Sequence, residues 1–419
     1  MFSRIGEAAF KKDLTNTLAL CKHLDNPHQQ IKTIHVAGTN GKGSVSHMLA
    51  SIFQSAGYKT GLYTSPHLYD FRERIRINGE MISEQFVVDF TGKMKPVIEQ
   101  INPSFFELTV AMAFDYFNKQ QVDIAIIETG LGGRLDSTNV ITPELSIITN
   151  IGWDHMNMLG NSLEEIAAEK AGIIKTNTPV IIGRKNNSTD AVFINMAKEK
   201  TAPIIFSADS WTVISSAQEP TYITVSLTNN NSKKTNEYII DLPGIYQIEN
   251  VQCVLSACEI AEKSGWKLTE VQIKEGLKNT RKQTGLHGRW ETIHNNPRII
   301  IEVAHNEDGI KSLNKQLSSI NYQQLHIILG MVKDKDATKV LSLLPASAQY
   351  YFTKAQLPRA LDEVSLKELA SQYSLSGEHY SNVNSALLTA IKNANNKTDL
   401  ILVIGSIFLA GEIDRSLLK

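Results

Sequence analysis

The chain has 419 residues, of which 42% are hydrophobic and 20% charged, a composition typical of a soluble globular enzyme with two or three domains. Its 42 lysines and arginines nearly balance 43 aspartates and glutamates, so no bulk charge is present that would hold nucleic acid or an acidic membrane surface. Three cysteines are too few for a disulfide framework, and no apolar run reaches the ~18 residues of a membrane span, so we expect a protein of the reducing cytoplasm.

The first half of the chain alternates short apolar strands with helical stretches. After a helical N-terminal segment, the strand IKTIHVA (31–37) runs directly into the glycine-rich GTNGKGS (38–44), and a helix with a glycine stop follows over 45–57. This alternation predicts a mostly parallel sheet covered by helices on both faces. The remaining strands of this series are expected at 59–64, 123–129, 145–151 and 179–183, and its helices at 84–100, 105–119 and 162–174.

Residues 211–242 have a different pattern, in which apolar and polar residues alternate on both sides of the polar stretch NNNSKKTN. This pattern predicts a β-hairpin with a long exposed turn, appended to the sheet. We predict a P-loop-type N-terminal domain over residues 1–283 and a smaller, Rossmann-like α/β domain over 284–419. The strands of this second α/β series are expected at 298–304, 325–331, 349–355 and 399–405.

The loop of residues 38–44 carries the strongest chemical signal. Its glycines let successive backbone N–H groups turn toward one anion, and the helix that follows directs its positive end to the same point. Lys42 can neutralise phosphate charge and Ser44 can assist a phosphate or a metal ion, although an extra glycine separates them compared with the usual phosphate loop. The strand and helix on either side favour phosphate binding over a simple turn.

Two further residues have notable positions in the sequence pattern. Glu128 ends the strand DIAIIE, and the carboxyl ends of parallel strands face the ligand crevice, where an acid can hold Mg²⁺. Lys170 lies on a helical stripe that is otherwise apolar, so it is either buried or extends outward past its neighbours. By themselves, His155 in WDHMNMLG and His305 after a predicted strand would be ordinary loop histidines.

Several motifs occur in one order along nearly the whole chain. They are AGTNGKGS (37–44), TSPHL (64–68), ERIRING (73–79), ETGLGGRLDSTN (128–139), GWDHMNMLG (152–160), AEKAGI (168–173), GIYQIENVQCVLSA (244–257), GRWE (288–291) and EVAHN (302–306). This series resembles the folylpolyglutamate synthase/dihydrofolate synthase family, within the wider Mur ligase superfamily. TSPHL with ERIRING is typical of the folate branch, whereas AGTNGKGS alone would indicate only the superfamily.

The resemblance implies a site for ATP and for one or two Mg²⁺ ions. It also implies that the lysine of the AEKAGI motif is carbamylated by CO₂, which turns an ammonium into an oxygen ligand. Carbamylation requires a neutral amine, and the apolar stripe around Lys170 fits that need. The implied ATP contacts are Thr39, Asn40, Gly41, Lys42, Gly43, Ser44, Asn250, Arg289 and Glu302, and the implied metal ligands are Ser65, Glu128, His155 and Lys170.

The implied acceptor site is matched less closely. A flat pterin or benzoyl ring requires an aromatic platform, and His305 is implied to lie near the phosphates and the incoming amino acid. The chain departs from the family pattern twice, with His287 where proline is usual and Glu302 where aspartate is usual. The implied acceptor contacts are Asp13, Phe105, Phe106, Glu107, Leu135, Asp136 and Ser137, of which the two phenylalanines could equally be core residues.

Together these features predict a monomeric ATP-dependent ligase that adds L-glutamate to dihydropteroate, to folate (poly)glutamates, or to both, through an acyl phosphate. Lys42, Lys170 and His305 are the predicted catalytic residues. Two alternatives remain: a cell-wall Mur-type ligase acting on a UDP-sugar peptide, and a non-catalytic nucleotide-binding protein on the same fold. The sequence leaves open whether a monovalent cation is also required.

Overall fold

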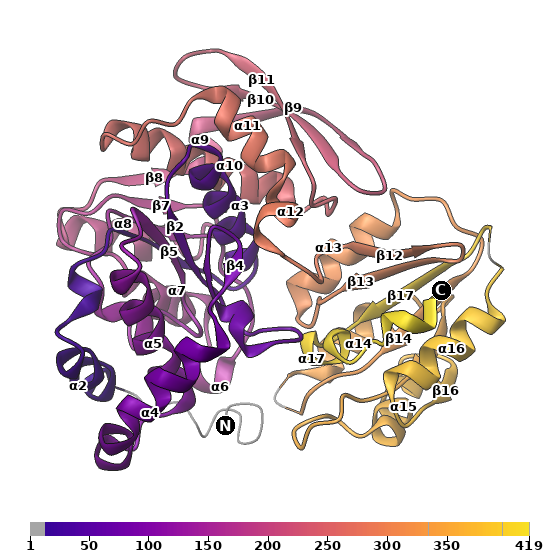
Figure 1. The fold of residues 1–419 in the computed structure, drawn as a ribbon. Helices are drawn as coiled ribbons and strands as arrows, with labels where there is room; N and C mark the ends of the chain where they lie inside the picture. Colours follow the sequence, from indigo (N-terminus) through magenta and orange to yellow (C-terminus); the bar gives the residue numbers. More distant parts are fainter. Residues whose placement is uncertain (1–12, 334, 396, 419) are drawn as a thin grey trace.

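The apolar runs of the first half form the strands of one large sheet. Its strands are β1 (Thr33–Ala37), β2 (Thr60–Tyr63), β3 (Ile75–Ile77), β4 (Glu80–Met81), β5 (Ile124–Glu128), β6 (Leu145–Ile148), β7 (Val180–Ile182) and β8 (Ile204–Phe206). The computed structural model (Figure 1) describes residues 13–333, 335–395 and 397–418. The strands of the large sheet have the order β4-β3-β2-β5-β1-β6-β7-β8. All neighbours are parallel except β2–β3 and β3–β4, so the predicted mostly parallel sheet is confirmed.

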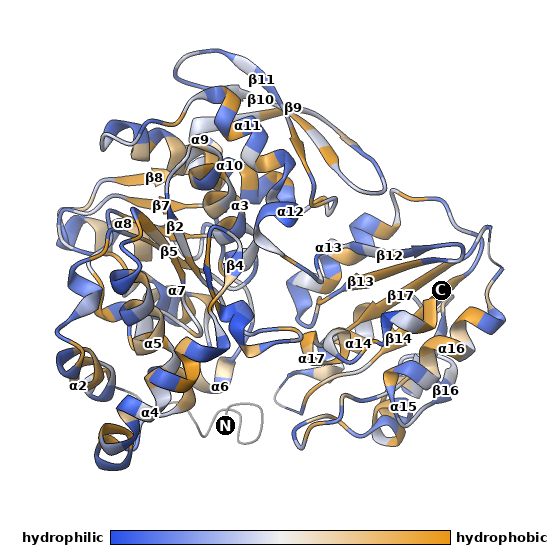
Figure 2. Ribbon diagram, in the orientation of Figure 1, coloured by the Kyte–Doolittle hydropathy of each residue, from blue (hydrophilic) through white to orange (hydrophobic). Residues whose placement is uncertain are grey.

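Helices cover both faces of this sheet. One face packs against α3 and α10, and the other against α4, α5, α7 and α8. The strands β1, β5 and β6 are buried throughout. In β5 this burial goes with a nearly continuous apolar run, whereas β1 and β6 also contain buried polar residues, Thr33, His35 and Ser146. Figure 2 shows the neighbouring strands β7 and β8 in the hydrophobic colour. The helices are α2 (Thr15–His23), α3 (Lys42–Ser55), α4 (Glu84–Ile101), α5 (Phe105–Lys119), α6 (Met156–Leu159), α7 (Leu163–Ala171), α8 (Asp190–Glu199), α9 (Ser207–Ser210), α10 (Gln247–Lys263), α11 (Glu270–Lys278) and α12 (Thr280–Thr284).

A small antiparallel sheet replaces the hairpin expected over 211–242. It has three strands rather than two, β9 (Trp211–Gln218), β10 (Ile223–Asn229) and β11 (Thr235–Ile240), in the order β11-β10-β9. Apart from Trp211, the residues of β9 are largely exposed, so this edge strand lacks the apolar alternation that identified the other two. Alternate residues of β10 are buried and join the core around α3 and α10.

The last third of the chain forms a second α/β unit, as predicted. Its sheet has the order β12-β13-β17-β14-β15-β16, antiparallel only at β12–β13. The strands are β12 (Glu291–Asn295), β13 (Arg298–Glu302), β14 (Leu325–Leu329), β15 (Gln349–Phe352), β16 (Gly377–His379) and β17 (Leu400–Ile404), and the helices are α13 (Glu307–Leu317), α14 (Ala337–Leu343), α15 (Glu363–Ser371), α16 (Val383–Asn393) and α17 (Ile407–Gly411). The division at residues 283 and 284 stays a prediction, and it falls at the end of α12. Within the described part of the chain, no helix is both long and apolar enough to cross a membrane.

Candidate functional site

A cavity of about 330 Å³ lies where the two α/β units meet. The loops that line it follow the carboxyl ends of β1, β2, β5 and β6 in one sheet and of β13, β14 and β17 in the other, which is where open α/β sheets bind ligands. Of the predicted residues, Asp13 and Leu135 are outside the lining; Asp13 is exposed and its Oδ1 accepts a hydrogen bond from Thr15 N (2.8 Å). The predicted residues that line the cavity are Thr39, Asn40, Gly41, Lys42, Gly43, Ser44, Ser65, Phe105, Phe106, Glu107, Glu128, Asp136, Ser137, His155, Lys170, Asn250, Arg289, Glu302 and His305.

The phosphate loop connects β1 to α3, which begins at Lys42. Gly41 has a φ of 84°, and a Cβ there would collide with the side-chain amide of Asn250, so only glycine fits. Asn150, after β6, holds the loop from the side: its Oδ1 accepts from Asn40 N (2.8 Å) and its backbone oxygen accepts from Thr39 N (3.0 Å). The first turn of α3 is therefore held open toward the cavity, where its free N–H groups can bind an anion.

A half-buried lysine and a buried one meet at one carbonyl of this loop. Lys42 Nζ donates to Gly38 O (3.1 Å) and to Thr39 O (3.3 Å), and Lys170 Nζ donates from α7 to the same Gly38 O (3.0 Å). Burial, and then the positive charge of Lys42, lower the pKa of Lys170 to about 7. Of the two orientations expected for Lys170, the structure has the buried one, with 4% of the residue exposed.

An acid and a guanidinium face the first turn of α3. Glu128, at the end of β5, is buried, and its Oε2 accepts from Ser65 N (3.0 Å). Burial raises the pKa of Glu128, an effect that the charge of Lys42 opposes. A Cβ placed on Gly43 would lie 3.7 Å from Glu128 Oε1 and 3.6 Å from Arg289 NH2. An anion at the N-terminus of α3 would therefore have Lys42 and Arg289 around it and Glu128 beside it.

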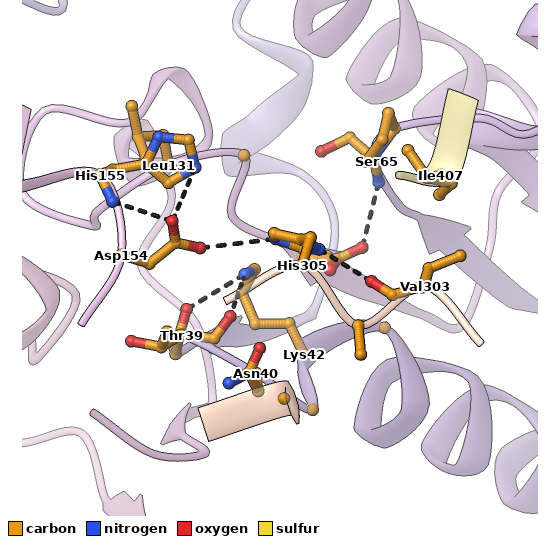
Figure 3. Close-up of a pocket in the computed structure, with 18 of the residues that line it drawn as sticks. Thr39, Asn40, Lys42, Ser65, Leu131, Asp154, His155, Val303, His305 and Ile407 are labelled. Carbon is orange, nitrogen blue, oxygen red and sulfur yellow. Dashed lines mark hydrogen bonds and ion pairs between the residues drawn. The ribbon is translucent and has the colours of Figure 1, made fainter. Parts of the chain in front are cut away.

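A second group of charged side chains closes the cavity on the side of His155 (Figure 3). Lys335 Nζ donates to Asp154 Oδ1 and to His155 Nε2 (2.9 Å), and His305 Nε2 lies 3.6 Å from Asp154 Oδ2. Burial alone would raise the pKa of Asp154, but the nearby His305 and the charge of Lys335 hold it well below its usual range. Burial, and then Lys335, lower the pKa of His155 to about 3, so this imidazole is neutral.

The predicted metal ligands divide into two pairs. Ser65 and Glu128 are adjacent and supply oxygen, the donor that Mg²⁺ prefers. His155 and Lys170 form the other pair, and the charge of Lys170 contributes to the low pKa of His155. Among residues 13–333, 335–395 and 397–418, no three His, Cys, Asp or Glu side chains are grouped for metal binding. Ser65 and Glu128 can bind a hard cation in their present positions. His155 can bind one only when Lys335 no longer contacts its Nε2.

Two phenylalanines at the start of α5 line the far end of the cavity. Phe106 lies so close to Gly130 that a Cβ on Gly130 would collide with its ring. The guanidinium carbon of Arg74 lies 5.5 Å from the centre of the Phe105 ring. Both rings are half-buried and belong to the cavity wall as well as to the edge of the core.

The two carboxylates that are predicted to contact the acceptor substrate, those of Glu107 and Asp136, accept hydrogen bonds from the protein itself. Glu107 forms a capping box with Ser104, whose N–H donates to Glu107 Oε2 (2.5 Å). Asp136 accepts from Leu131 N (2.7 Å) and Thr138 N (3.0 Å). Both acids therefore fix the backbone that shapes this end of the cavity.

Glu302, which stands where the family usually has aspartate, is also held by hydrogen bonds from neighbouring residues. Glu302, at the end of β13, is buried, and its Oε2 accepts from Tyr246 OH (2.7 Å) and from Trp290 N (2.9 Å). Asn250 is held on α10 by Gln247, whose Oε1 accepts from its amide (2.8 Å). Glu302 thus joins the segment before α10 to the C-terminal sheet, and its predicted contact with ribose stays a prediction.

The bridging loop, residues 64–74, reaches from β2 to the C-terminal sheet. Leu68 packs against the hydrophobic cluster there, and Tyr69 OH accepts from Arg415 NH2 (3.0 Å). Arg415 also donates to Glu291 Oε1 (2.8 Å), which lies 2.9 Å from His287 Nδ1. Burial alone would raise the pKa of Glu291, but His287 and Arg415 lower it to about 2. His287, the other departure from the family pattern, therefore helps to hold the bridging loop.

Among the residues that the sequence did not predict are Asp154 and Lys335, which line the cavity, and Asn306, which bonds the lining residue Asn40. Asp154 directly precedes His155 in GWDHMNMLG, so its motif could have indicated it. The side-chain amides of Asn306 and Asn40 bond each other across 266 positions (3.0 and 3.3 Å), and no local pattern predicts such a pair. One feature of the sequence could have indicated Lys335 as a site residue, namely its position soon after the carboxyl end of β14.

Known families match both parts of the chain. A family model described as the Mur ligase middle domain matches residues 36–258, and one described as the Mur ligase glutamate ligase domain matches residues 288–407. The chain is 32% identical over 417 residues to the dihydrofolate synthase/folylpolyglutamate synthase of Bacillus subtilis, an alignment that covers 97% of this chain and 95% of that protein.

Solved structures have the same fold. Escherichia coli FolC, in complex with DHPP and ADP, matches with a TM-score of 0.86 and 27% identity, over 98% of this chain and 94% of that one. The bifunctional folylpolyglutamate synthase/dihydrofolate synthase of Yersinia pestis, complexed with AMPPNP and a manganese ion, matches with a TM-score of 0.84 and 26% identity, over 98% and 95% of the two chains. These matches confirm the resemblance and the fold predicted from the sequence.

Proposed function

Because this chain belongs to the Mur ligases and, within them, to the folylpolyglutamate and dihydrofolate synthases, it is an ATP-dependent ligase that adds glutamate to folate species, and we propose that its acceptor is 7,8-dihydropteroate, a folate that already carries glutamate, or both. One observation carries the assignment of this chemistry to the cavity. The phosphate loop, Arg289, the acid of β5 and the paired phenylalanines all line the same space between the two α/β units.

The first step transfers a phosphoryl group from ATP. A carboxylate oxygen of the acceptor attacks the γ-phosphorus, and the bond from that phosphorus to the β–γ bridging oxygen breaks, so its electron pair leaves with ADP. Lys42 and Arg289, which face the first turn of α3, offset the negative charge that spreads over the transferred group. A divalent cation bound at Ser65 and Glu128 would supply further positive charge at the phosphate oxygens.

The second step forms the amide. The neutral amine of L-glutamate attacks the carbonyl carbon of the acyl phosphate, and phosphate departs with the amine proton. His305 and Asp154, at the C-terminal side of the cavity, are the proposed groups near the incoming amino acid. An acyl phosphate hydrolyses readily in water, so contacts that hold the two units together around it, such as that between Asn40 and Asn306, protect the intermediate.

The remaining assignments are also proposals. Lys170 is proposed to be a carbamate, because its buried amine is poised between charged and neutral forms near pH 7. The chain is proposed to act as a monomer, since one copy supplies every group used in both steps. A cytoplasmic location is supported by its three cysteines, which are free thiols.

Release of ADP tests the proposal directly. Purified protein with ATP, Mg²⁺, dihydropteroate and L-glutamate is expected to release ADP, and omission of any one component is expected to stop it. A tetrahydrofolate that carries glutamate, used in place of dihydropteroate, then shows which acceptors are used. Turnover only with a UDP-sugar peptide would favour the cell-wall ligase, and absence of turnover with every acceptor would favour the non-catalytic alternative.

Replacing the proposed metal ligands is expected to weaken metal binding. Glu128→Gln and His155→Ala should each raise the Mg²⁺ concentration for half-maximal activity at least about tenfold, because each removes a donor to the cation. Mn²⁺ binding, followed by electron paramagnetic resonance, should weaken in parallel, whereas affinity for dihydropteroate should not change. The exposed Glu164→Gln on α7 is the control. Unchanged metal titrations in both variants would show that these residues do not bind the metal.

A further inference from the structure

Arg74 is a buried cation in the cavity wall to which neither proposed step assigns a role. It ends the short 3-10 helix Phe71–Arg74 and immediately precedes β3. Only 7% of the residue is exposed, and Arg74 belongs to the lining of the cavity, together with Ser65 and Phe105. Its position is therefore between the aromatic end of the cavity and the end that carries Glu128.

The side chain of Arg74 is held on two sides. Its Nε donates to His67 Nδ1 (2.8 Å), and its guanidinium carbon lies over the ring of Phe105. Burial lowers the pKa of His67, so this imidazole accepts the bond as a neutral group. With Nε occupied, the two terminal NH₂ groups are the remaining donors. The uncharged hydroxyl of Tyr63 interacts with them but cannot accept from all of their N–H bonds, so donors remain for a ligand.

Within the part of the chain that the structure describes, the charge of Arg74 has no carboxylate partner at ion-pair distance. Burial lowers its pKa, although the guanidinium remains charged at any ordinary pH. No carboxylate in residues 13–333, 335–395 or 397–418 forms an ion pair with it. The two acids whose charge acts on it are both engaged: Glu73 accepts from three backbone N–H groups of the bridging loop, and Glu128 accepts from Ser65 N. A buried, unpaired guanidinium is costly, and an anion that enters the cavity would relieve that cost.

We propose, resting on the function assigned above, that Arg74 binds the carboxylate of the acceptor substrate and holds the oxygen that does not attack ATP. The acceptor rings would lie at Phe105 and Phe106 and the phosphate at the start of α3, so the reacting carboxylate must lie between them. Arg74 lies over the ring of Phe105 and also interacts with the charge of Glu128, so it is placed between these two ends. A planar guanidinium matches a carboxylate better than an ammonium does.

This placement gives Arg74 a role in both chemical steps. During phosphoryl transfer, the free carboxylate oxygen attacks while the held oxygen becomes the carbonyl oxygen of the acyl phosphate. When the amine nitrogen then bonds to the carbonyl carbon, the π electron pair moves onto the held oxygen. That pair returns to re-form the carbonyl as the carbon–oxygen bond to phosphate breaks. The guanidinium thus stabilises the oxyanion of the tetrahedral intermediate.

Two ligands that differ only at the carboxylate test the proposal. One is dihydropteroate, and the other is its decarboxylated analogue, in which hydrogen replaces the carboxyl group; both are titrated by fluorescence with ADP and Mg²⁺ present. The wild-type protein should bind the carboxylate ligand about 10- to 100-fold more tightly than the analogue, the range expected for hydrogen bonds to a charged group. Arg74→Gln should abolish that preference, and Arg74→Lys should retain only part of it.

Arg72→Gln is the matched control, because Arg72 lies in the same loop and pairs with Asp70 and Glu84 instead of facing the cavity. It should keep the wild-type preference. ADP affinity reports whether each variant is folded, and Arg74→Lys carries the test if the glutamine variant is not. An unchanged preference in a folded Arg74 variant would overturn the role of Arg74 alone. If the wild-type protein bound neither ligand, the acceptor class itself would be wrong.

Discussion

Lys42→Ala is expected to reduce turnover by at least about 10²- to 10³-fold without unfolding the protein. Lys42 begins α3, and its amine already lies among the carbonyls of the phosphate loop. When phosphate is bound, the same amine can turn from those carbonyls to the anion, and alanine removes that charge. Steady-state release of ADP measures the effect, and circular dichroism measures the fold.

A lysine outside the cavity provides the comparison for this variant. Lys93 is exposed on α4, and Lys93→Ala should retain the wild-type rate. The affinity for the acceptor should also be unchanged in Lys42→Ala, because Phe105 and Phe106 lie at the other end of the cavity. A folded Lys42→Ala protein with near-normal turnover would show that phosphate is not bound at this loop.

Lys170→Ala is the second variant expected to lose most of its activity, by about 10²-fold or more. A Lys170 ammonium would repel a metal ion, whereas a carbamate carries a negative charge and offers oxygen. Lys170→Arg should be equally inactive, because a guanidinium remains protonated and cannot react with CO₂. A short carboxylic acid added to Lys170→Ala is expected to restore part of the activity by occupying the vacated space.

The pH dependence expected of the proposed carbamate follows from the buried position of Lys170. With a pKa of about 7, the amine is mostly neutral above pH 7 and can attack CO₂. As the pH falls below 7, the amine becomes an ammonium without a free electron pair, so carbamate occupancy and activity should fall together. ¹³C nuclear magnetic resonance with labelled bicarbonate detects the carbamate directly. Absence of that signal, together with full activity of Lys170→Arg, would refute the modification.

The phosphate end of the site could be predicted because its information is local. The strand before residue 38, the glycines and the helix after residue 41 are continuous in sequence, and the predicted elements agree with β1 and α3 to within a few residues. Glu128 could be predicted for the same reason, because the end of a strand is visible in the apolar run of that strand. The buried orientation of Lys170 was left open, because an apolar stripe does not show what covers it.

The contacts made by the C-terminal sheet could not be predicted in this way. Lys335 reaches Asp154 and His155 across about half the chain, and nothing near Lys335 in the sequence indicates that approach. Arg74 lay within a recognised motif, but its importance depends on burial and on the absence of an acidic partner, which only the packed structure reveals. The third strand of the small sheet was missed because its exposed residues carry no apolar pattern.

The contact between Tyr69 and Arg415 also bears on how the protein is made. The two residues are 346 positions apart, so the bridging loop is synthesised long before the segment that holds its tip. On the ribosome, the large sheet and its phosphate loop can fold from residues already released, while the loop that carries Ser65 and Arg74 still lacks its contact with the C-terminal sheet. A nascent chain would therefore bind nucleotide before it could position an acceptor, and ligase activity would begin only when translation is nearly finished.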